Sequence, residues 1–216
     1  MIPTLERESE LLERGFEFII SLDEVGRGAI AGPVMVGAAV FDRRLGVAPE
    51  GIKDSKLVSE KKRPVVAEAI KGWLETWAVG HSSAQDVDRY GITHALGRAA
   101  VRAVAEIAKT RDISRAVVLL DGHHDWLSPV MAEPIAVVTQ VKADRDCLSV
   151  AASSLLAKVT RDQIMIDADD EFPGYGFAGH KGYGAKSHFE AIEQLGPCSL
   201  HRLTWLKAPT LPIDEG

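Results

Sequence analysis

Two apolar runs near the amino terminus, joined by a glycine-rich turn, constrain the fold of this chain more than any other feature. The runs cover residues 16–22 and 34–41, and each has the length of a β-strand. The segment between them is too short for a helical crossover, so the sequence predicts that the two strands pair antiparallel.

An acidic pair lies directly after the first run. Asp23 and Glu24 are followed by Gly-Arg-Gly at residues 26–28, and two more aspartates, Asp121 and Asp144, also follow apolar runs. Ionised carboxylates at the mouth of a buried strand are costly to desolvate unless a cation compensates them, and oxygen ligands suit Mg²⁺ or Mn²⁺. The pattern favours a divalent-metal site; for the pair alone, a solvated strand end is the simpler interpretation.

Strand and helix patterns alternate along the rest of the chain. Short apolar runs predict further strands, the last two covered on both sides, at residues 77–81, 116–120 and 135–141. Helices are predicted at residues 59–73, 91–109 and 187–195, with a long helix from about residue 148. This order is typical of an α/β domain with a mixed central sheet flanked by helices. The three aspartates would then lie at strand ends, where open sheets of this class carry their sites.

Two of these helices carry more specific expectations. Ser59 is the expected N-cap of the first, with Pro64 near its start. The long helix is expected to bury a stripe formed by Leu148, Ala152, Leu155, Val159 and Ile166.

Composition supports a globular protein of this kind. The 216 residues are 46% hydrophobic and 26% charged, enough for a sizeable core, and no apolar run predicts a transmembrane helix. Cys147 and Cys198 are too few for a disulfide framework, and the charged start of the chain does not resemble a signal peptide. We therefore expect a cytoplasmic protein.

The net charge of −6 neither supports nor excludes a nucleic-acid ligand, because attraction to phosphate depends on local charge. Basic residues gather at two places, which are either phosphate contacts or solvated faces: Lys53, Lys56, Lys61, Lys62 and Arg63, and later Lys181, Lys186 and Arg202.

A series of short motifs runs along the chain. They are Asp-Glu-Val-Gly-Arg-Gly at residues 23–28, Gly-Pro at 32–33, Lys-Asp-Ser-Lys at 53–56, Asp-Gly at 121–122, Val-Lys-Ala-Asp at 141–144 and Ala-Ala-Ser-Ser-Leu-Leu-Ala-Lys-Val at 151–159. Later come Pro-Gly-Tyr-Gly-Phe at 173–177, His-Lys-Gly-Tyr-Gly at 180–184, Gly-Pro at 196–197 and His-Arg at 201–202. In type and order, over nearly the whole chain, they resemble the bacterial ribonuclease HII family. The resemblance implies an RNase H-like fold, with a catalytic domain at residues 1–170 and a small helical, substrate-contacting segment at 171–216 packed on it.

The resemblance also implies roles for particular residues. Two divalent ions, Mn²⁺ or Mg²⁺, would be held by Asp23, Glu24, Asp121 and Asp144. The turn of Gly26, Arg27 and Gly28 would read the 2′-hydroxyl of a ribonucleotide. Tyr183 would stack on the following sugar, and backbone phosphates would be held by Lys53, Ser55 and Lys56.

One local expectation follows from strand geometry. An ideal strand points Asp23 and Glu24 to opposite faces, so we expect the strand to break at the acidic pair. Gly26 and Gly28 fit such a break, because glycine tolerates unusual backbone angles and lets a ligand approach closely.

The implied activity is metal-dependent hydrolysis of the RNA strand of RNA/DNA hybrids. It includes incision on the 5′ side of single ribonucleotides embedded in duplex DNA, which leaves 3′-hydroxyl and 5′-phosphate ends. Such an activity belongs to DNA replication and ribonucleotide excision repair. The expected partners are RNA/DNA hybrids and DNA duplexes containing ribonucleotides, with no membrane; we expect a monomer, and the sequence identifies no protein partner.

Other interpretations fit the sequence less well. Ribonuclease HIII typically carries an extra N-terminal domain, whereas only residues 1–22 precede Asp23 here. A catalytically silent hybrid binder would be expected to lack some of the four acids, and a two-metal hydrolase of small substrates would have no use for the Gly-Arg-Gly turn and Tyr183. Adjacent His123 and His124 lack a recognised zinc-ligand spacing.

Several other side chains keep two interpretations. His180 and His201 either contact the site or satisfy hydrogen bonds of the tail, and Lys158 and Arg161 are either exposed charges or phosphate contacts. Residues 153–154, both serine, are better explained by helix packing than as nucleophiles.

Overall fold

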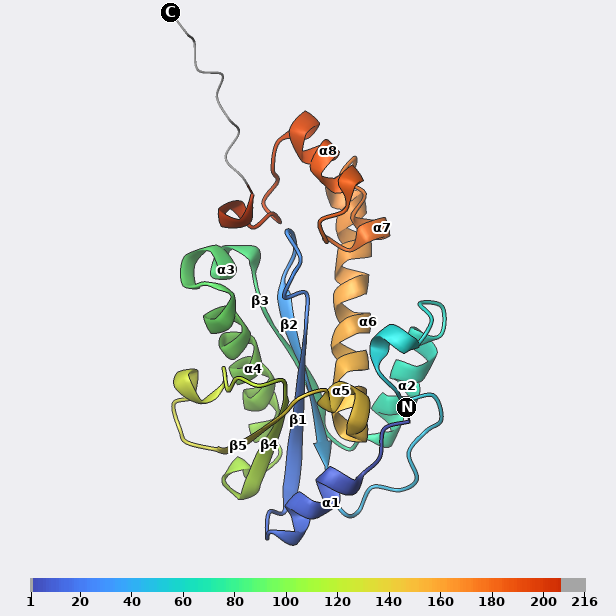
Figure 1. Cartoon of the computed structure of the whole chain (residues 1–216), viewed down its shortest axis with the longest axis vertical. Coiled ribbons are helices and arrows are strands. Elements are labelled where there is room, and N and C mark those ends of the chain that lie inside the picture. Colours follow the sequence, from blue (N-terminus) through green and yellow to red (C-terminus); the bar gives the residue numbers. More distant parts are fainter. Residues whose placement is uncertain (1, 207–216) are drawn as a thin grey trace, which may run out of the picture.

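The apolar runs of the sequence form the centre of a mixed five-stranded sheet in the computed structural model, which describes residues 2–206 (Figure 1). The strands are β1 (Phe18–Val25), β2 (Val34–Phe41), β3 (Trp77–Ser82), β4 (Ala116–Asp121) and β5 (Ala136–Gln140). Their spatial order is β3-β2-β1-β4-β5. The predicted antiparallel pairing of the first two strands is confirmed, and β4 and β5 extend the sheet in parallel.

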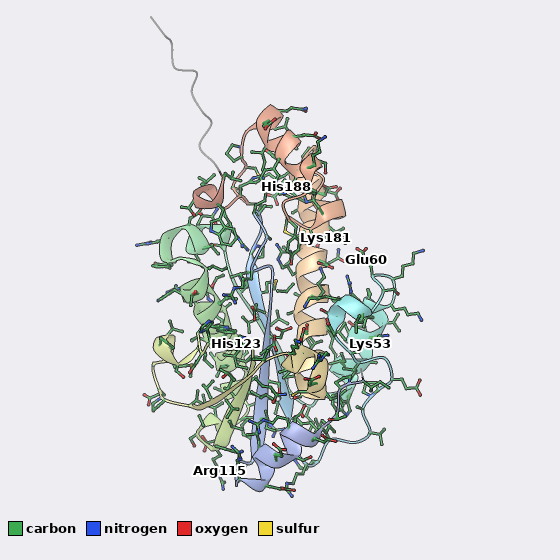
Figure 2. The ribbon with its side chains drawn as sticks, in the orientation of Figure 1. Lys53, Glu60, Arg115, His123, Lys181 and His188 are labelled. Carbon is green, nitrogen blue, oxygen red and sulfur yellow. The ribbon has the colours of Figure 1, made fainter. Side chains whose placement is uncertain are left out.

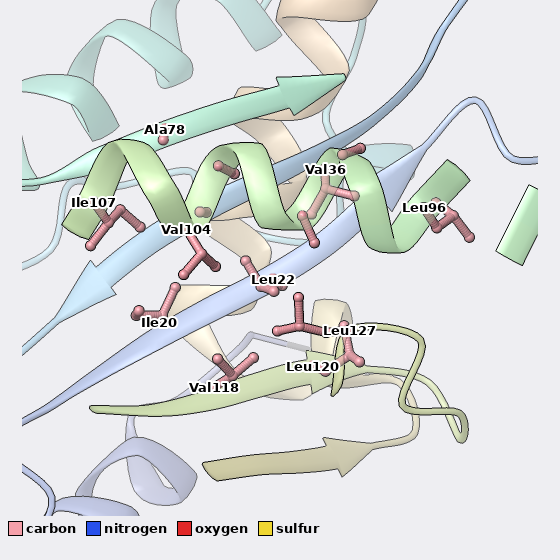
Figure 3. Close-up of a cluster of buried hydrophobic side chains, with 14 of the residues drawn as sticks. Ile20, Leu22, Val36, Ala78, Leu96, Val104, Ile107, Val118, Leu120 and Leu127 are labelled. Carbon is pink, nitrogen blue, oxygen red and sulfur yellow. The ribbon is translucent and has the colours of Figure 1, made fainter. Parts of the chain in front are cut away.

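Side chains of each strand alternate between the two faces of the sheet. On one face Ile20 and Leu22 of β1 join Val118 and Leu120 of β4 in a hydrophobic cluster (Figure 3). On the other face, the Ser21 hydroxyl is hydrogen-bonded to that of Ser149.

Two helices cover these faces (Figure 1). α4 (Ile92–Ala108) packs on β2 and β3, and α6 (Leu148–Glu171) lies across β1 and β2 on the opposite face. The approach of α6 is close because β2 has a glycine there. A Cβ atom on Gly37 would collide with the carbonyl oxygen of Ser153.

The remaining helices are shorter. They are α1 (Glu6–Glu13), α2 (Arg63–Trp73), α3 (Ala84–Tyr90), α5 (Ala143–Asp146), α7 (Phe177–His180) and α8 (Lys186–Leu195), with 3₁₀ turns η1 (Ser55–Leu57), η2 (Ile113–Arg115), η3 (Ser128–Val130) and η4 (Leu203–Trp205). Within residues 2–206, no helix is both long enough and apolar enough to cross a bilayer.

The segment after α6 folds back onto the end of that helix, beside the turn between β1 and β2 (Figure 1). Met165 of α6 forms a buried cluster with Tyr175, Phe177 and Ala31. A β-bridge also joins Ala31 to His201. These contacts attach the tail to the turn that follows β1. The domain boundary expected at residue 171 stays a prediction, and residues 207–216 of that segment lie outside the described part.

Most expected elements are present, and three local expectations are wrong. The first predicted helix begins at Arg63 with Lys62 as N-cap, not at Ser59. Ile166 is 39% exposed because the last turns of α6 extend beyond the sheet. β5 is an edge strand with half-exposed side chains, not a strand covered on both sides.

The predicted break of the first strand at the acidic pair is also wrong. β1 continues to Val25, and its pairing with β2 includes Asp23 opposite Gly37 and Glu24 opposite Val36. What ends at Leu22 is the pairing with β4. The long antiparallel partner keeps β1 extended after its other neighbour has diverged.

Candidate active site

Asp23 and Asp121 are brought together by the register of two parallel strands. The last paired residues of β1 and β4 are Leu22 and Leu120, so the next residue of each strand carries one of the two aspartates. Both side chains follow the alternation toward the face that α6 covers. Asp23 is 6% exposed.

Glu24 and Asp144 complete the acidic group from different elements. Glu24 is the next residue of β1, and its Oε1 atom accepts a hydrogen bond from Arg27 Nη1 at 3.3 Å. Asp144 does not lie at a strand end as expected; it lies in the short helix α5. Asp121 Oδ1 fixes the start of that helix, because it accepts from the backbone N–H of Ala143 at 2.6 Å and of Asp144 at 3.4 Å.

All four carboxylates line one pocket of about 240 Å³. The rest of its lining comes from the turn after β1, from η1, from α6 and from the tail: Val25, Gly26, Arg27, Gly28, Ser55, Lys56, Ser154, Lys158 and Tyr183. Every site residue expected from the sequence except Lys53 therefore lines this pocket. Lys53 is exposed in the loop before η1 (Figure 2).

The carboxylates disfavour one another's ionisation. Burial raises the pKa of Asp23 well above its usual value, with further increases from Glu24, Asp121 and Asp144 and a partial offset from the Ser154 hydroxyl. Burial also raises the pKa of Glu24, against the hydrogen bond from Arg27. For Asp121, burial and then the charge of Asp144 raise the pKa. A cation in the pocket would relieve this repulsion.

The side chains fit a hard divalent cation in donor chemistry, since all four offer carboxylate oxygens. Within residues 2–206, however, no group of three or more His, Cys, Asp or Glu side chains is arranged so that it could hold a metal ion directly. Cations of the protein lie beside the acids: Lys56 Nζ is 3.4 Å from Asp144 Oδ2, and Arg27 is bonded to Glu24. The acids share a pocket without converging on a single point.

The Gly-Arg-Gly turn forms one wall of the pocket. Gly26 has a φ of 82°, a left-handed angle that favours glycine, and its carbonyl accepts from the N–H of Ala29. Among residues 2–206, the backbone N–H groups of Arg27 and Gly28 have no backbone acceptor. Two adjacent donors are thus available at the wall of the pocket.

Tyr183 forms part of another wall. Its ring lies near two cations of α6, with Lys158 Nζ 5.9 Å and the Arg161 guanidinium carbon 5.3 Å from the ring centre. Its backbone carbonyl is hydrogen-bonded to His188 Nδ1 at 2.8 Å. The loop that carries the ring is therefore held from α6 and from α8.

The expected histidines lie outside the pocket lining. His180, His188 and His201 form a buried or half-buried cluster in the tail, with His188 Nε2 3.1 Å from His201 Nε2 (Figure 2 labels His188). His180 and His201 were expected either to contact the site or to satisfy hydrogen bonds of the tail, and their position agrees with the second. His180 is hydrogen-bonded to the carbonyl of Tyr175, and His201 accepts from the N–H of Cys198.

Two arginines that support the pocket lie in environments that the sequence did not predict: Arg161, expected as an exposed charge or a phosphate contact, donates instead to the backbone carbonyls of Ala31, Pro33 and Lys181. Arg161 and Arg202 are both fully buried, although Arg202 and Lys181 were expected on a basic surface. Lys181 is 7% exposed and lies 3.1 Å from Glu60 (Figure 2). The sequence around these two arginines gave no sign of burial, because their partners are backbone carbonyls from distant segments.

Both the sequence and the fold are similar to those of known proteins. The family model described as Ribonuclease HII matches residues 20–208. A ribonuclease HII of Streptomyces avermitilis is 42% identical over 198 residues, covering 92% of this chain and 81% of that protein. A chain of the PCNA:RNase HII complex from Archaeoglobus fulgidus has a TM-score of 0.70 at 23% identity, covering 90% of this chain and 98% of that one. Bst-RNase HIII in complex with Mn²⁺ has a TM-score of 0.66 at 21% identity, covering 88% of this chain and 68% of that one. The expected RNase H-like fold is confirmed.

Proposed function

The chain belongs to the ribonuclease HII family, whose members are type 2 ribonuclease H enzymes acting on RNA/DNA hybrids, and from this premise we propose that it also cuts duplex DNA on the 5′ side of a single embedded ribonucleotide. The proposal is carried by one observation. A single pocket is lined by four carboxylates, by the Gly-Arg-Gly turn and by Tyr183.

Asp23, Glu24, Asp121 and Asp144 are the residues that would hold two divalent ions, Mn²⁺ or Mg²⁺. Such ions, when bound, supply activation of water and stabilisation of the departing oxygen at phosphorus. Three of these acids lie near the ends of the parallel strands β1 and β4, and Asp144 lies in α5. All four line one pocket.

The proposed position of the cut determines the attacking group. The phosphate on the 5′ side of a ribonucleotide is joined to the 3′-oxygen of the preceding deoxynucleotide, whereas the 2′-hydroxyl neighbours the phosphate on the 3′ side. Water therefore attacks, the bond from phosphorus to that 3′-oxygen breaks, and the oxygen takes a proton. The products carry a 3′-hydroxyl and a 5′-phosphate, and no cyclic phosphate forms.

Substrate choice comes from two parts of the pocket lining, the Gly-Arg-Gly turn and Tyr183. The free N–H groups of Arg27 and Gly28 are suited to bind the 2′-hydroxyl, which alone distinguishes RNA from DNA at one nucleotide. The ring of Tyr183 is suited to stack on the following sugar, where a deoxyribose fits better. Lys56 and Lys158 line the same pocket and are suited to contact phosphates, with Lys53 and Ser55 beside them.

The test is a cleavage assay on a labelled duplex with one ribonucleotide, a matched all-DNA duplex and a long RNA/DNA hybrid. We expect one cut on the 5′ side of the ribonucleotide in Mg²⁺ or Mn²⁺, none with chelator, and none in the all-DNA duplex. Cyclic-phosphate ends, or an uncut single-ribonucleotide duplex beside a well-cut hybrid, would refute the proposal.

The wider setting follows from this activity. We propose that the protein acts in the cytoplasm, in DNA replication and ribonucleotide excision repair. We further propose that it works as a monomer, which sedimentation can check.

A further inference from the structure

Arg202 lies directly behind the Gly-Arg-Gly turn, although it is far from it in the sequence. Its Nη2 atom donates to the carbonyl of Gly26 at 2.7 Å and to that of Gly32 at 3.2 Å, and its Nη1 atom donates to the carbonyl of Arg27 at 3.0 Å. The backbone of Arg202 also donates to the carbonyl of Ile30. One side chain therefore binds two carbonyls of the turn and a third, that of Gly32, after it.

By fixing two carbonyl groups, these bonds also fix the direction of the N–H groups in the same two peptides. In a planar trans peptide the C=O and the N–H point in opposite directions, and no cis peptide is found in residues 2–206. The carbonyl of Gly26 shares its peptide with the N–H of Arg27, and the carbonyl of Arg27 shares its peptide with the N–H of Gly28. With both carbonyls bound to Arg202, both N–H groups point away from it, and the residues that carry them line the pocket.

The arrangement is costly, which indicates that stability alone does not explain it. Arg202 is fully buried, forms no ion pair with a carboxylate among residues 2–206, and leaves its Nε atom without a partner. Burial and the nearby Arg161 lower its pKa to about 10. A buried cation without a carboxylate destabilises a fold, and such local violations are typical of functional positions.

We propose that Arg202 is the positioning residue for 2′-hydroxyl recognition, because it orients the N–H groups of Arg27 and Gly28 into the pocket. The inference rests on the proposed function. Arg202 itself does not contact the substrate; it acts through the turn.

The test measures preference, not activity alone. In an Asp121→Asn background, which prevents cleavage, fluorescence anisotropy gives the dissociation constants of a duplex with one ribonucleotide and of a matched all-DNA duplex. Arg202→Lys keeps the charge but lacks the planar, forked guanidinium that binds the three carbonyls. We expect its preference for the ribonucleotide duplex to fall about tenfold, the worth of one lost hydrogen bond, with affinity for the all-DNA duplex unchanged.

Two controls separate this role from simple support of the fold. Ile107→Ala, in the buried face of α4 away from the pocket, lowers stability and should leave the preference intact. Trp205→Ala removes the ring that lies 4.9 Å from the Arg202 guanidinium and should lower the preference about threefold. This milder variant keeps the test available if Arg202→Lys does not fold.

The outcomes distinguish failure of the proposed function from failure of the role proposed for Arg202. If the Asp121→Asn protein itself shows no preference for the ribonucleotide, the proposed function fails. If it shows one and Arg202→Lys retains it, or loses affinity equally for both duplexes, the role of Arg202 is refuted. An unchanged preference in folded Trp205→Ala, where Arg202→Lys cannot be measured, refutes it as well.

Discussion

At the scale of single residues, the four acids of the pocket differ in what surrounds them. Asp23 is enclosed by α6 and the sheet, Glu24 is paired with Arg27, and Asp144 with Lys56. Within residues 2–206, Asp121 has no cationic side chain bonded to it and accepts only backbone N–H groups of α5. Its charge is therefore the one most directly available to a bound cation.

Replacing Asp121 by asparagine should nearly abolish cleavage and leave duplex binding largely intact. Asparagine keeps the shape of the side chain but removes the charge that a divalent ion requires. Turnover is measured in saturating Mg²⁺ and Mn²⁺, and binding by anisotropy. Near-normal turnover in either metal would remove Asp121 from the catalytic group.

Replacing Tyr183 by alanine should weaken cleavage at an isolated ribonucleotide by about tenfold, because stacking on an aromatic ring is worth roughly 1–3 kcal/mol. Tyr183→Phe is the matched control, since it keeps the ring and should cut nearly as well as the parent. Rates on the single-ribonucleotide duplex decide the matter. Equal rates for the alanine and phenylalanine variants would show that the ring does not contribute.

At the scale of elements, patterns within one segment were predictable, whereas most contacts between distant segments were not. The apolar face of α4 follows from its own periodicity, and the buried β4 from its run of β-branched residues. The antiparallel pairing of β1 with β2 was predicted from the short turn between them, but its register, which carries β1 through the acidic pair to Val25, was not. α1 was missed because its charges obscured Leu11 and Leu12, while its buried Glu8 accepts hydrogen bonds from Ser149 of α6.

Replacing Gly37 by alanine should lower the free energy of unfolding by about 3 kcal/mol, the upper range for overpacking. The added Cβ atom would collide with a backbone oxygen of α6, which cannot rotate aside. Gly72→Ala is the matched control: it is an open position in α2, and alanine should stabilise the helix by about 0.5 kcal/mol. Denaturant unfolding measures both, and an equal effect of the two variants would contradict the close packing.

At the scale of the whole molecule, the site depends on residues from both ends of the described chain. Asp23, Glu24 and Asp121 could be predicted from the sequence because they follow apolar runs, and the strand register brings Asp23 and Asp121 together. Asp144 was expected at a strand end and lies in α5 instead. Arg202, Arg161 and His188 could not be predicted, because each acts on backbone carbonyls that only the folded tail places nearby.

The tail should lose stability as the pH falls. Burial, with smaller effects from His180 and His201 and an opposing hydrogen bond to Tyr183, lowers the pKa of His188 to about 4 from its ordinary 6.5. The unfolded chain therefore binds a proton that the folded one excludes, so stability is full above about pH 6.5 and declines toward about pH 4.

The measurement compares the parent with His188→Gln, which cannot titrate. Between pH 7 and pH 5 the parent should lose stability relative to this variant, and the His188 ring signals in NMR should stay those of a neutral imidazole. A ring that titrates near pH 6.5 in the folded protein would contradict the buried, neutral state.

The long helix α6 has one further consequence. Ser154 lines the acidic pocket, Arg161 binds the carbonyl of Lys181 in the Tyr183 loop, and Met165 anchors the tail cluster. The acidic pocket and the Tyr183 loop are therefore spaced along one helix, which advances about 1.5 Å and turns about 100° with each residue. A single deletion between Ser154 and Arg161 would turn the tail out of phase with the sheet, whereas insertions in the surface loops would leave that spacing unchanged. α6 thus fixes the spacing between the acids of the pocket and the loop that carries Tyr183.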